Sequence, residues 1–130
     1  MTRILVIDDD RTSLLLYETV LRKEGYEVTS ATNGPEGLKH LKSERPDLVV
    51  LDISMPGMDG LEVLARIMSI DRRVPIVLNS GYSSYRNNFL SWAADAYVVK
   101  SPDPSELKRI INNLLRHRAV EGSFPRASEP

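Results

Sequence analysis

The residues best suited to chemistry are six polar side chains that come directly after, or at the end of, short apolar runs. They are Asp8, Asp9, Asp10, Asp52, Ser80 and Lys100. Carboxylates held close together repel each other, so either one of them keeps a proton or a cation lies between them. A pocket with two or three carboxylates and room for water suits Mg²⁺, with Mn²⁺ as the alternative.

A carboxylate beside such a cation can attack phosphorus and form an aspartyl phosphate. The cation would neutralise the phosphoryl oxygens and align the group for transfer. Lys100 would add a balancing positive charge, and Ser80 could donate one hydrogen bond. These residue types therefore indicate phosphoryl transfer to Asp52.

Bringing these residues together requires a parallel sheet whose strands all end at the same edge. Five short apolar runs alternate with five amphipathic segments, and this βα alternation predicts an α/β fold with a doubly wound, five-stranded parallel sheet and five helices on its two faces. Ligands of such sheets bind beyond the carboxyl ends of the strands. The expected strands cover residues 4–7, 26–30, 48–51, 74–78 and 96–99.

Local signals mark several helix ends. Gly25 is expected to end the first helix, and Pro35 to stand in the first turn of the second. A weaker helix is expected over residues 85–94. Asp103 is expected to cap the last helix, with Glu106 completing a capping box.

Three further expectations concern side chains and the end of the chain. His40 and His117 lie on polar helical stretches and are expected to be solvated. The periodic pattern ends near residue 118. The sequence therefore predicts one domain over residues 1–118 and a flexible tail or linker over 119–130.

Composition narrows the class of protein. The chain has 130 residues, 17 Lys and Arg against 18 Asp and Glu, a formal charge of −1 and no cysteine. Disulfides and thiolate metal sites are thereby excluded, and the lack of basic excess argues against direct nucleic-acid binding. No apolar run approaches the length of a membrane span or signal peptide. We expect a cytoplasmic protein that does not bind membranes.

From about Arg3 to Arg116 the sequence resembles the receiver domain of two-component response regulators, and in size a stand-alone, single-domain regulator. The resemblance rests on four segments. They are Val6-Ile7-Asp8-Asp9, Leu51-Asp52-Ile53-Ser54-Met55-Pro56-Gly57-Met58-Asp59-Gly60, Asn79-Ser80-Gly81 and Asp95-Ala96-Tyr97-Val98-Val99-Lys100. It implies the flavodoxin-like strand order 2-1-3-4-5.

The resemblance also implies a role for each matching residue. Asp52 matches the phosphoacceptor, and Asp8 and Asp9 the metal-binding acid pair, with Asp9 the more direct ligand. The carbonyl of Ser54 would also bind the metal. Ser80 and Lys100 match the residues that contact the phosphoryl oxygens, and Ser80 and Tyr97 match a pair that switches the protein surface.

Such a protein is a signalling switch rather than an enzyme, catalysing only its own phosphorylation and dephosphorylation. The implied partners are a histidine kinase or histidine phosphotransfer protein and a downstream protein target. The resemblance allows a dimer through the face formed by the helix at 85–94, the strand at 96–99 and the last helix.

One departure from the family leaves an alternative open. The family usually has a cis proline directly after the lysine, whereas this sequence has Ser101 and then Pro102. A cis bond before a residue other than proline costs about 2.5–4 kcal/mol. The alternative function is a receiver-like adaptor that binds partner proteins without phosphorylation.

Other functions of similar folds lack their required motifs. A flavin-binding module needs a Ser-, Thr- or Gly-rich loop after the first strand, where this chain is acidic. No G-x-x-x-x-G-K-[ST] loop for nucleotide hydrolysis occurs. An aspartate-based phosphatase would need a second acid where Ser54 stands.

Overall fold

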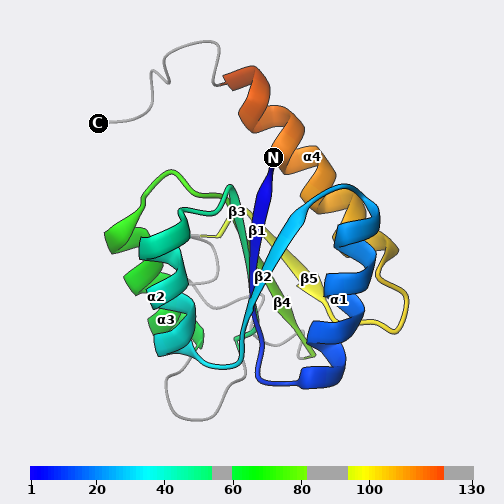
Figure 1. Cartoon of the computed structure of the whole chain (residues 1–130), viewed down its shortest axis with the longest axis horizontal. Coiled ribbons are helices and arrows are strands. Elements are labelled where there is room, and N and C mark those ends of the chain that lie inside the picture. Colours follow the sequence, from blue (N-terminus) through cyan, green and yellow to red (C-terminus); the bar gives the residue numbers. More distant parts are fainter. Residues whose placement is uncertain (54–59, 82–93, 122–130) are drawn as a thin grey trace.

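The computed structural model describes residues 1–53, 60–81 and 94–121, and it contains a five-stranded, fully parallel sheet (Figure 1). The strand order is β2-β1-β3-β4-β5, which confirms the expected doubly wound, flavodoxin-like topology. The strands are β1 (Arg3–Ile7), β2 (Glu27–Ala31), β3 (Leu48–Leu51), β4 (Ile76–Ser80) and β5 (Ala96–Val99).

Helices cover both faces of the sheet. The described helices are α1 (Arg11–Lys23), α2 (Gly34–Glu44), α3 (Gly60–Ile70) and α4 (Ser105–Glu121). Helices α1 and α4 lie on one face, and α2 and α3 on the other (Figure 1). The fifth expected helix, at 85–94, falls almost wholly outside the described residues. Among the described helices, none has the length and apolar character needed to cross a bilayer.

The sheet separates two hydrophobic cores. Leu5, Val49 and Leu78 face α2 and α3, whereas Val6, Val50 and Val77 face α1 and α4. Because side chains alternate along a strand, a strand buried on both faces needs an unbroken apolar run. This requirement explains why β1 and β3 could be recognised from their sequences.

Strand β4 starts and ends two residues later than expected. Pro75 has no N–H to donate, so it cannot join the ladder as an ordinary strand residue. Its carbonyl accepts from the N–H of Val49 at 2.9 Å, and the strand begins at Ile76. The strand extends to Ser80 and includes Asn79, which lies beyond the expected end at residue 78.

The caps of the first two helices follow the expected chemistry. The Asp10 side chain accepts from the N–H of Thr12 at 3.0 Å, and Asn33 accepts from Glu36 at 2.8 Å. Helix α1 ends before Gly25, whose φ of 94° lies in the region that favours glycine. Each cap satisfies backbone groups that the helix itself leaves unpaired.

The expected capping box on α4 is only half correct. Asp103 accepts from the N–H of Ser105 at 3.0 Å, as a cap should. Its own N–H, however, donates to the hydroxyl of Ser101 at 3.2 Å rather than to Glu106. A serine two residues upstream therefore replaces the glutamate as the acceptor.

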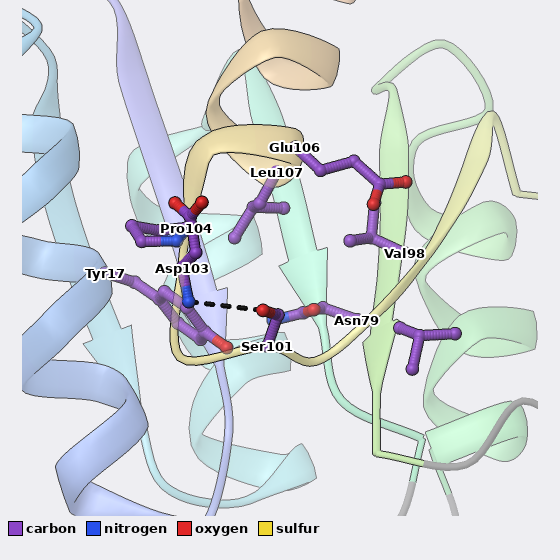
Figure 2. A pocket seen from close by; sticks show the side chains of 9 residues that line it. Tyr17, Asn79, Val98, Ser101, Asp103, Pro104, Glu106 and Leu107 are labelled. Carbon is purple, nitrogen blue, oxygen red and sulfur yellow. Dashed lines mark hydrogen bonds between the residues drawn. The ribbon is translucent and has the colours of Figure 1, made fainter.

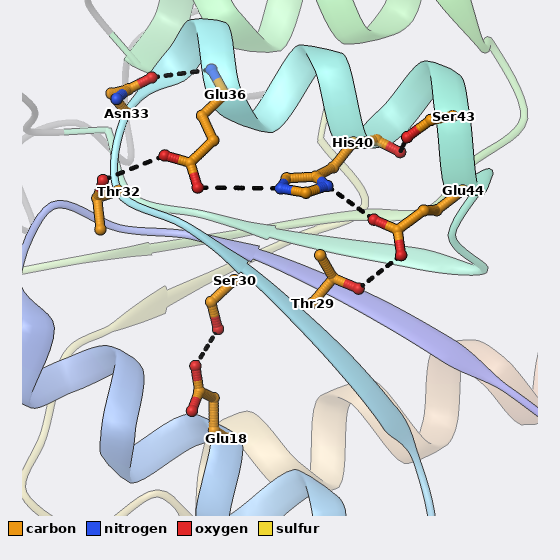
Figure 3. Close-up of polar contacts among 9 residues, drawn as sticks. All are labelled: Glu18, Thr29, Ser30, Thr32, Asn33, Glu36, His40, Ser43 and Glu44. Atoms are coloured by element: carbon orange, nitrogen blue, oxygen red, sulfur yellow. Dashed lines mark hydrogen bonds and ion pairs between the residues drawn. The ribbon is translucent and has the colours of Figure 1, made fainter.

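The sequence suggested that His40 of α2 is solvated, but its side chain also contacts two carboxylates. Its Nδ1 lies 2.7 Å from a Glu44 carboxylate oxygen, and its Nε2 lies 3.9 Å from Glu36 (Figure 3). Glu44 also accepts from the hydroxyl of Thr29 on β2. Glu36, His40 and Glu44 follow each other at intervals of four along α2, so they lie on one face of the helix, against the edge strand.

Gly60 allows the first turn of α3 to approach the end of β3 closely. Its N–H donates to the carbonyl of Ile53 at 3.0 Å. A Cβ at this position would lie 2.3 Å from Ile53 Cα and 2.6 Å from the carbonyl oxygen of Asp52. Because both neighbours are backbone atoms, they cannot move aside as a flexible side chain would.

We therefore expect Gly60→Ala to destabilise the protein by about 1–3 kcal/mol, the usual cost of overpacking. Urea unfolding would measure the change. Gly81→Ala is the matched control, since its Cβ would meet nothing within 4 Å, and it should alter stability by no more than about 0.5 kcal/mol. Equal stability of the two variants would contradict the close approach.

Candidate functional site

Backbone pairing at the ends of the strands brings the acidic residues together. The N–H of Asp8 donates to the carbonyl of Ala31 at 3.0 Å, and that of Asp52 donates to Ile7 at 2.9 Å. These bonds extend the ladders of β1 and β3 by one residue. Asp8 and Asp52 therefore leave neighbouring strands at the same level, although they lie far apart in sequence.

The same kind of bond places Lys100. Its N–H donates to the carbonyl of Ser80 at 2.7 Å, one step beyond the paired residues of β4 and β5. Its side chain then reaches back over the sheet edge. The ammonium nitrogen lies 2.8 Å from Asp8 Oδ2 and 3.3 Å from Asp52 Oδ2.

The three expected acids form one cluster. Ligand oxygens of Asp8, Asp9 and Asp52 all lie within 4.8 Å of one another. Asp8 is 1% exposed and Asp52 is 4% exposed, whereas Asp9 lies at the surface. Buried carboxylates are rare unless they are paired, and here the pairing cation is Lys100.

The charges around Lys100 affect its protonation. Burial alone would lower the pKa of its ammonium group, but the hydrogen bond to Asp8 and the charges of Asp52 and Asp8 outweigh burial and raise that pKa. Lys100 is therefore a permanent cation at neutral pH. Its ammonium lies beside two of the three carboxylates, Asp8 and Asp52.

The donor set fits a hard divalent cation. Three carboxylates with oxygens in close proximity are the ligands that Mg²⁺ prefers, and one of them is open to solvent, so water can complete the coordination. The same oxygens also suit Mn²⁺.

Ser80 and Tyr97 lie at the ends of the neighbouring strands. Ser80 is fully buried at the end of β4, and its backbone pairs with Val99. Tyr97 is half-buried on β5, pairs with Leu78, and packs against the core that faces α2 and α3. Both expected switch residues are thus on adjacent strands. Ser54, the expected carbonyl ligand, lies outside the described residues.

The loop after Lys100 shows how the chain accommodates the missing proline. In the parts of the chain that the structure describes, every peptide bond is trans, including the one that joins Lys100 to Ser101. Lys100 nevertheless reaches both acids. Ser101 instead uses its hydroxyl to accept from Asp103.

The sequence analysis assigned no role to the side-chain amide of Asn79, which lies on the face of the sheet that carries α1 and α4. Asn79 of β4 is 2% exposed, and it lies near the hydroxyl of Tyr17 on α1. Burial raises the pKa of Tyr17, and the nearby amide opposes that rise. The signal was present in the run Ile-Val-Leu-Asn-Ser, where a single amide interrupts an apolar strand.

Comparison with known proteins identifies the same family that the sequence resemblance and the site indicate. The sequence model of the response regulator receiver domain matches residues 4–112. The transcriptional regulatory protein PrrA of Mycobacterium leprae is 40% identical over 120 residues, which cover 91% of this chain and 52% of PrrA. The chain thus spans about half the length of this curated relative.

Solved structures agree with the sequence comparison. The response regulator TrrA of Thermotoga maritima, in complex with Mg²⁺-BeF, matches with a TM-score of 0.84 and 47% identity, over 88% of this chain and 99% of TrrA. TrrA bound to the histidine kinase ThkA matches with a TM-score of 0.83 and 48% identity, over 88% and 99% of the two chains. The family match, the strand order and the acid cluster together confirm the resemblance. The chain belongs to the family of response regulator receiver domains.

Proposed function

We propose that this receiver domain takes a phosphoryl group from a phosphohistidine onto a carboxylate oxygen of Asp52, and that this step switches a surface for protein binding. The observation that carries the proposal is the buried group of Asp8, Asp52 and Lys100, which lies beside the exposed carboxylate of Asp9. Receiver domains act as signalling switches rather than as enzymes that turn over a separate substrate.

Asp8 is held in place and in turn fixes Lys100. One carboxylate oxygen, Oδ1, accepts from the N–H of Asp10 at 2.9 Å, and the other, Oδ2, contacts Lys100 at 2.8 Å. With both oxygens engaged inside the protein, Asp8 is suited to position the site. Asp9, at the surface, is the better candidate for a direct metal ligand.

The metal site is proposed to consist of Asp8, Asp9 and Asp52 with the carbonyl of Ser54. A bound Mg²⁺ would supply positive charge and would orient the phosphoryl oxygens. Asp52 provides the attacking oxygen: its bond to phosphorus forms as the bond between phosphorus and the donor imidazole nitrogen breaks. The donor keeps the electron pair of that bond.

Lys100 and Ser80 are proposed to bind the oxygens of the transferred group. Lys100 lies 3.3 Å from Asp52 Oδ2, so its ammonium is already beside the atom that would carry phosphorus. Preorganised charge of this kind needs no rearrangement at the moment of transfer. Ser80 would donate from its hydroxyl at the end of β4.

Tyr97 is the proposed link from the phosphoryl group to the protein surface. It neighbours β4 through its pairing with Leu78, two residues before Ser80. A shift of Ser80 toward a phosphoryl oxygen would change the space beside Tyr97 and bias its side chain between two positions. This is a population shift that one new hydrogen bond and one new charge can drive.

The proposed partners follow from this chemistry. The donor is a histidine kinase or a histidine phosphotransfer protein, and the receiver TrrA provides a precedent in its complex with the kinase ThkA. We further propose a downstream protein target and a dimer through the face formed by the expected helix at 85–94, β5 and α4. We also propose a cytoplasmic location and a division into a domain (1–118) and a flexible tail or linker (119–130).

Incubation with Mg²⁺ and acetyl phosphate should give a phosphoryl adduct by intact mass, and Asp52→Asn should abolish it. The side-chain amide of asparagine is a poor nucleophile, so the substitution removes the phosphoryl-accepting oxygen at position 52. Asp10→Asn is the matched control, because asparagine also caps a helix and removes the same charge. An adduct in Asp52→Asn would refute the assignment. No adduct in the unaltered protein with any phosphodonor would favour the adaptor.

Mg²⁺ should raise the thermal stability of the protein, because a ligand that binds only the folded state stabilises it. At about 100 times the dissociation constant, the gain is about 2.7 kcal/mol. Asp9→Asn should remove most of this gain, whereas Asp10→Asn should keep it. Thermal melting with Mg²⁺ or EDTA would measure both, and equal gains in the two variants would exclude Asp9 as a ligand.

A further inference from the structure

A cavity of about 160 Å³ lies on the face of the sheet that carries α1 and α4 (Figure 2). Its walls come from β4, β5, the loop that leads into α4, the first turn of α4 and one residue of α1. The residues that matter most are Tyr17, Asn79, Val98, Ser101, Asp103 and Leu107. None of these is an expected residue of the phosphorylation site.

The inner wall of this cavity contains a donor, Asn79 Nδ2, that has no acceptor at hydrogen-bonding geometry among the described residues, although the Tyr17 hydroxyl is close enough for the amide to lower its pKa. Asn79 is 2% exposed, and its Nδ2 makes no hydrogen bond of normal geometry within the described part of the chain. Figure 2 shows its side chain directed toward Ser101 and Tyr17. Buried polar groups are normally paired, so such a donor calls for a partner that is not part of the protein fold.

The other walls define the chemistry of that partner. Val98, Leu107 and Pro104 offer apolar surface, and the hydroxyls of Tyr17 and Ser101 add polar groups. Asp103 and Glu106 place two carboxylates on the outer side, where they would repel an anion. The cavity therefore suits a neutral molecule with an apolar body and a hydrogen-bond acceptor.

The size of the cavity fits one small organic molecule. An engineered cavity of about 150 Å³ in another protein binds a benzene ring. A benzene-sized molecule with a single carbonyl group would fill the present cavity to a similar degree. We propose that this cavity binds a small neutral molecule whose carbonyl or hydroxyl oxygen accepts a hydrogen bond from Asn79 Nδ2.

The position of the cavity connects it to the phosphorylation site. Asn79 directly precedes Ser80, and Ser101 directly follows Lys100. A molecule held between Asn79 and the loop at 101–104 would restrain both neighbours at once. Occupancy should therefore favour the arrangement of Lys100 and Ser80 that meets the incoming phosphoryl oxygens, and so speed transfer. This second step rests on the proposed function.

Benzamide and benzoate are matched probes for binding, since they share a ring and differ mainly in charge. By NMR, benzamide should shift the side-chain amide signals of Asn79 saturably, and benzoate should bind at least tenfold more weakly. Absence of saturable shifts would mean that water alone fills the cavity. That result, or equal binding of benzoate, would overturn the proposal.

Asn79→Leu keeps the side-chain size and removes the donor. It should weaken benzamide binding at least tenfold while melting at an equal or higher temperature than the unaltered protein, because an unpaired buried donor is lost. Thr29→Val on β2 is the control, because it also replaces a polar side chain of the sheet by an apolar one. It should leave benzamide binding unchanged. Unchanged binding in Asn79→Leu would refute the role of the amide.

The connection to Lys100 and Ser80 has its own test. Saturating benzamide should raise the rate of adduct formation from acetyl phosphate at least twofold, and it should have no effect in Asn79→Leu. If benzamide left the rate of adduct formation unchanged, only the proposed coupling between the cavity and phosphoryl transfer would be overturned. A protein that forms no adduct with or without benzamide would overturn the proposed function instead, and the binding measurement would stand.

Discussion

The contact of Lys100 with Asp8 and Asp52 is the interaction on which the rest of the site depends. Two carboxylates that are 1% and 4% exposed lie at one sheet edge, and each would be costly to bury without a counter-charge. A single ammonium within 3.3 Å of both provides it. Because the three residues belong to three strand ends, the ladders of β1, β3 and β5 must keep their registers for the cluster to exist.

In this cluster three carboxylates lie beside the ammonium of Lys100. In the proposed function, this set of oxygens would favour a divalent ion. The incoming phosphoryl group is itself negative, so it is attracted only when additional positive charge is present. In the proposed function, metal binding and phosphoryl acceptance would therefore depend on each other, a common feature of phosphoryl transfer sites.

The fold and the centre of the site were predictable from the sequence because both follow from strand ends. Runs such as 48–51 are apolar on both faces only in a covered parallel sheet, and such sheets bring their carboxyl ends to one edge. Asp8, Asp52 and Lys100 then had to meet. No knowledge of side-chain conformation was needed to place them.

Features that depend on tertiary partners were not predictable in this way. Pro75 lacks an N–H and delays β4, and its carbonyl pairs with Val49, a residue distant in sequence. His40 contacts Glu44, which also pairs with Thr29 of the edge strand. Ser101 replaces Glu106 in the cap of α4 because a trans loop brings its hydroxyl to Asp103. Local patterns contain none of these partners.

The alternation of side chains along β4 explains how one strand can serve two sites. Ser80 and Leu78 share one face, and Asn79 and Val77 share the other. The strand is rigidly paired on both sides, so the backbone cannot move at Ser80 without moving at Asn79. The hydroxyl proposed to respond to phosphorylation is therefore joined covalently to the amide whose Nδ2 has no hydrogen-bond acceptor among the described residues. A molecule that accepts a hydrogen bond from this amide would act on the same short segment of backbone that the proposed phosphoryl group would displace.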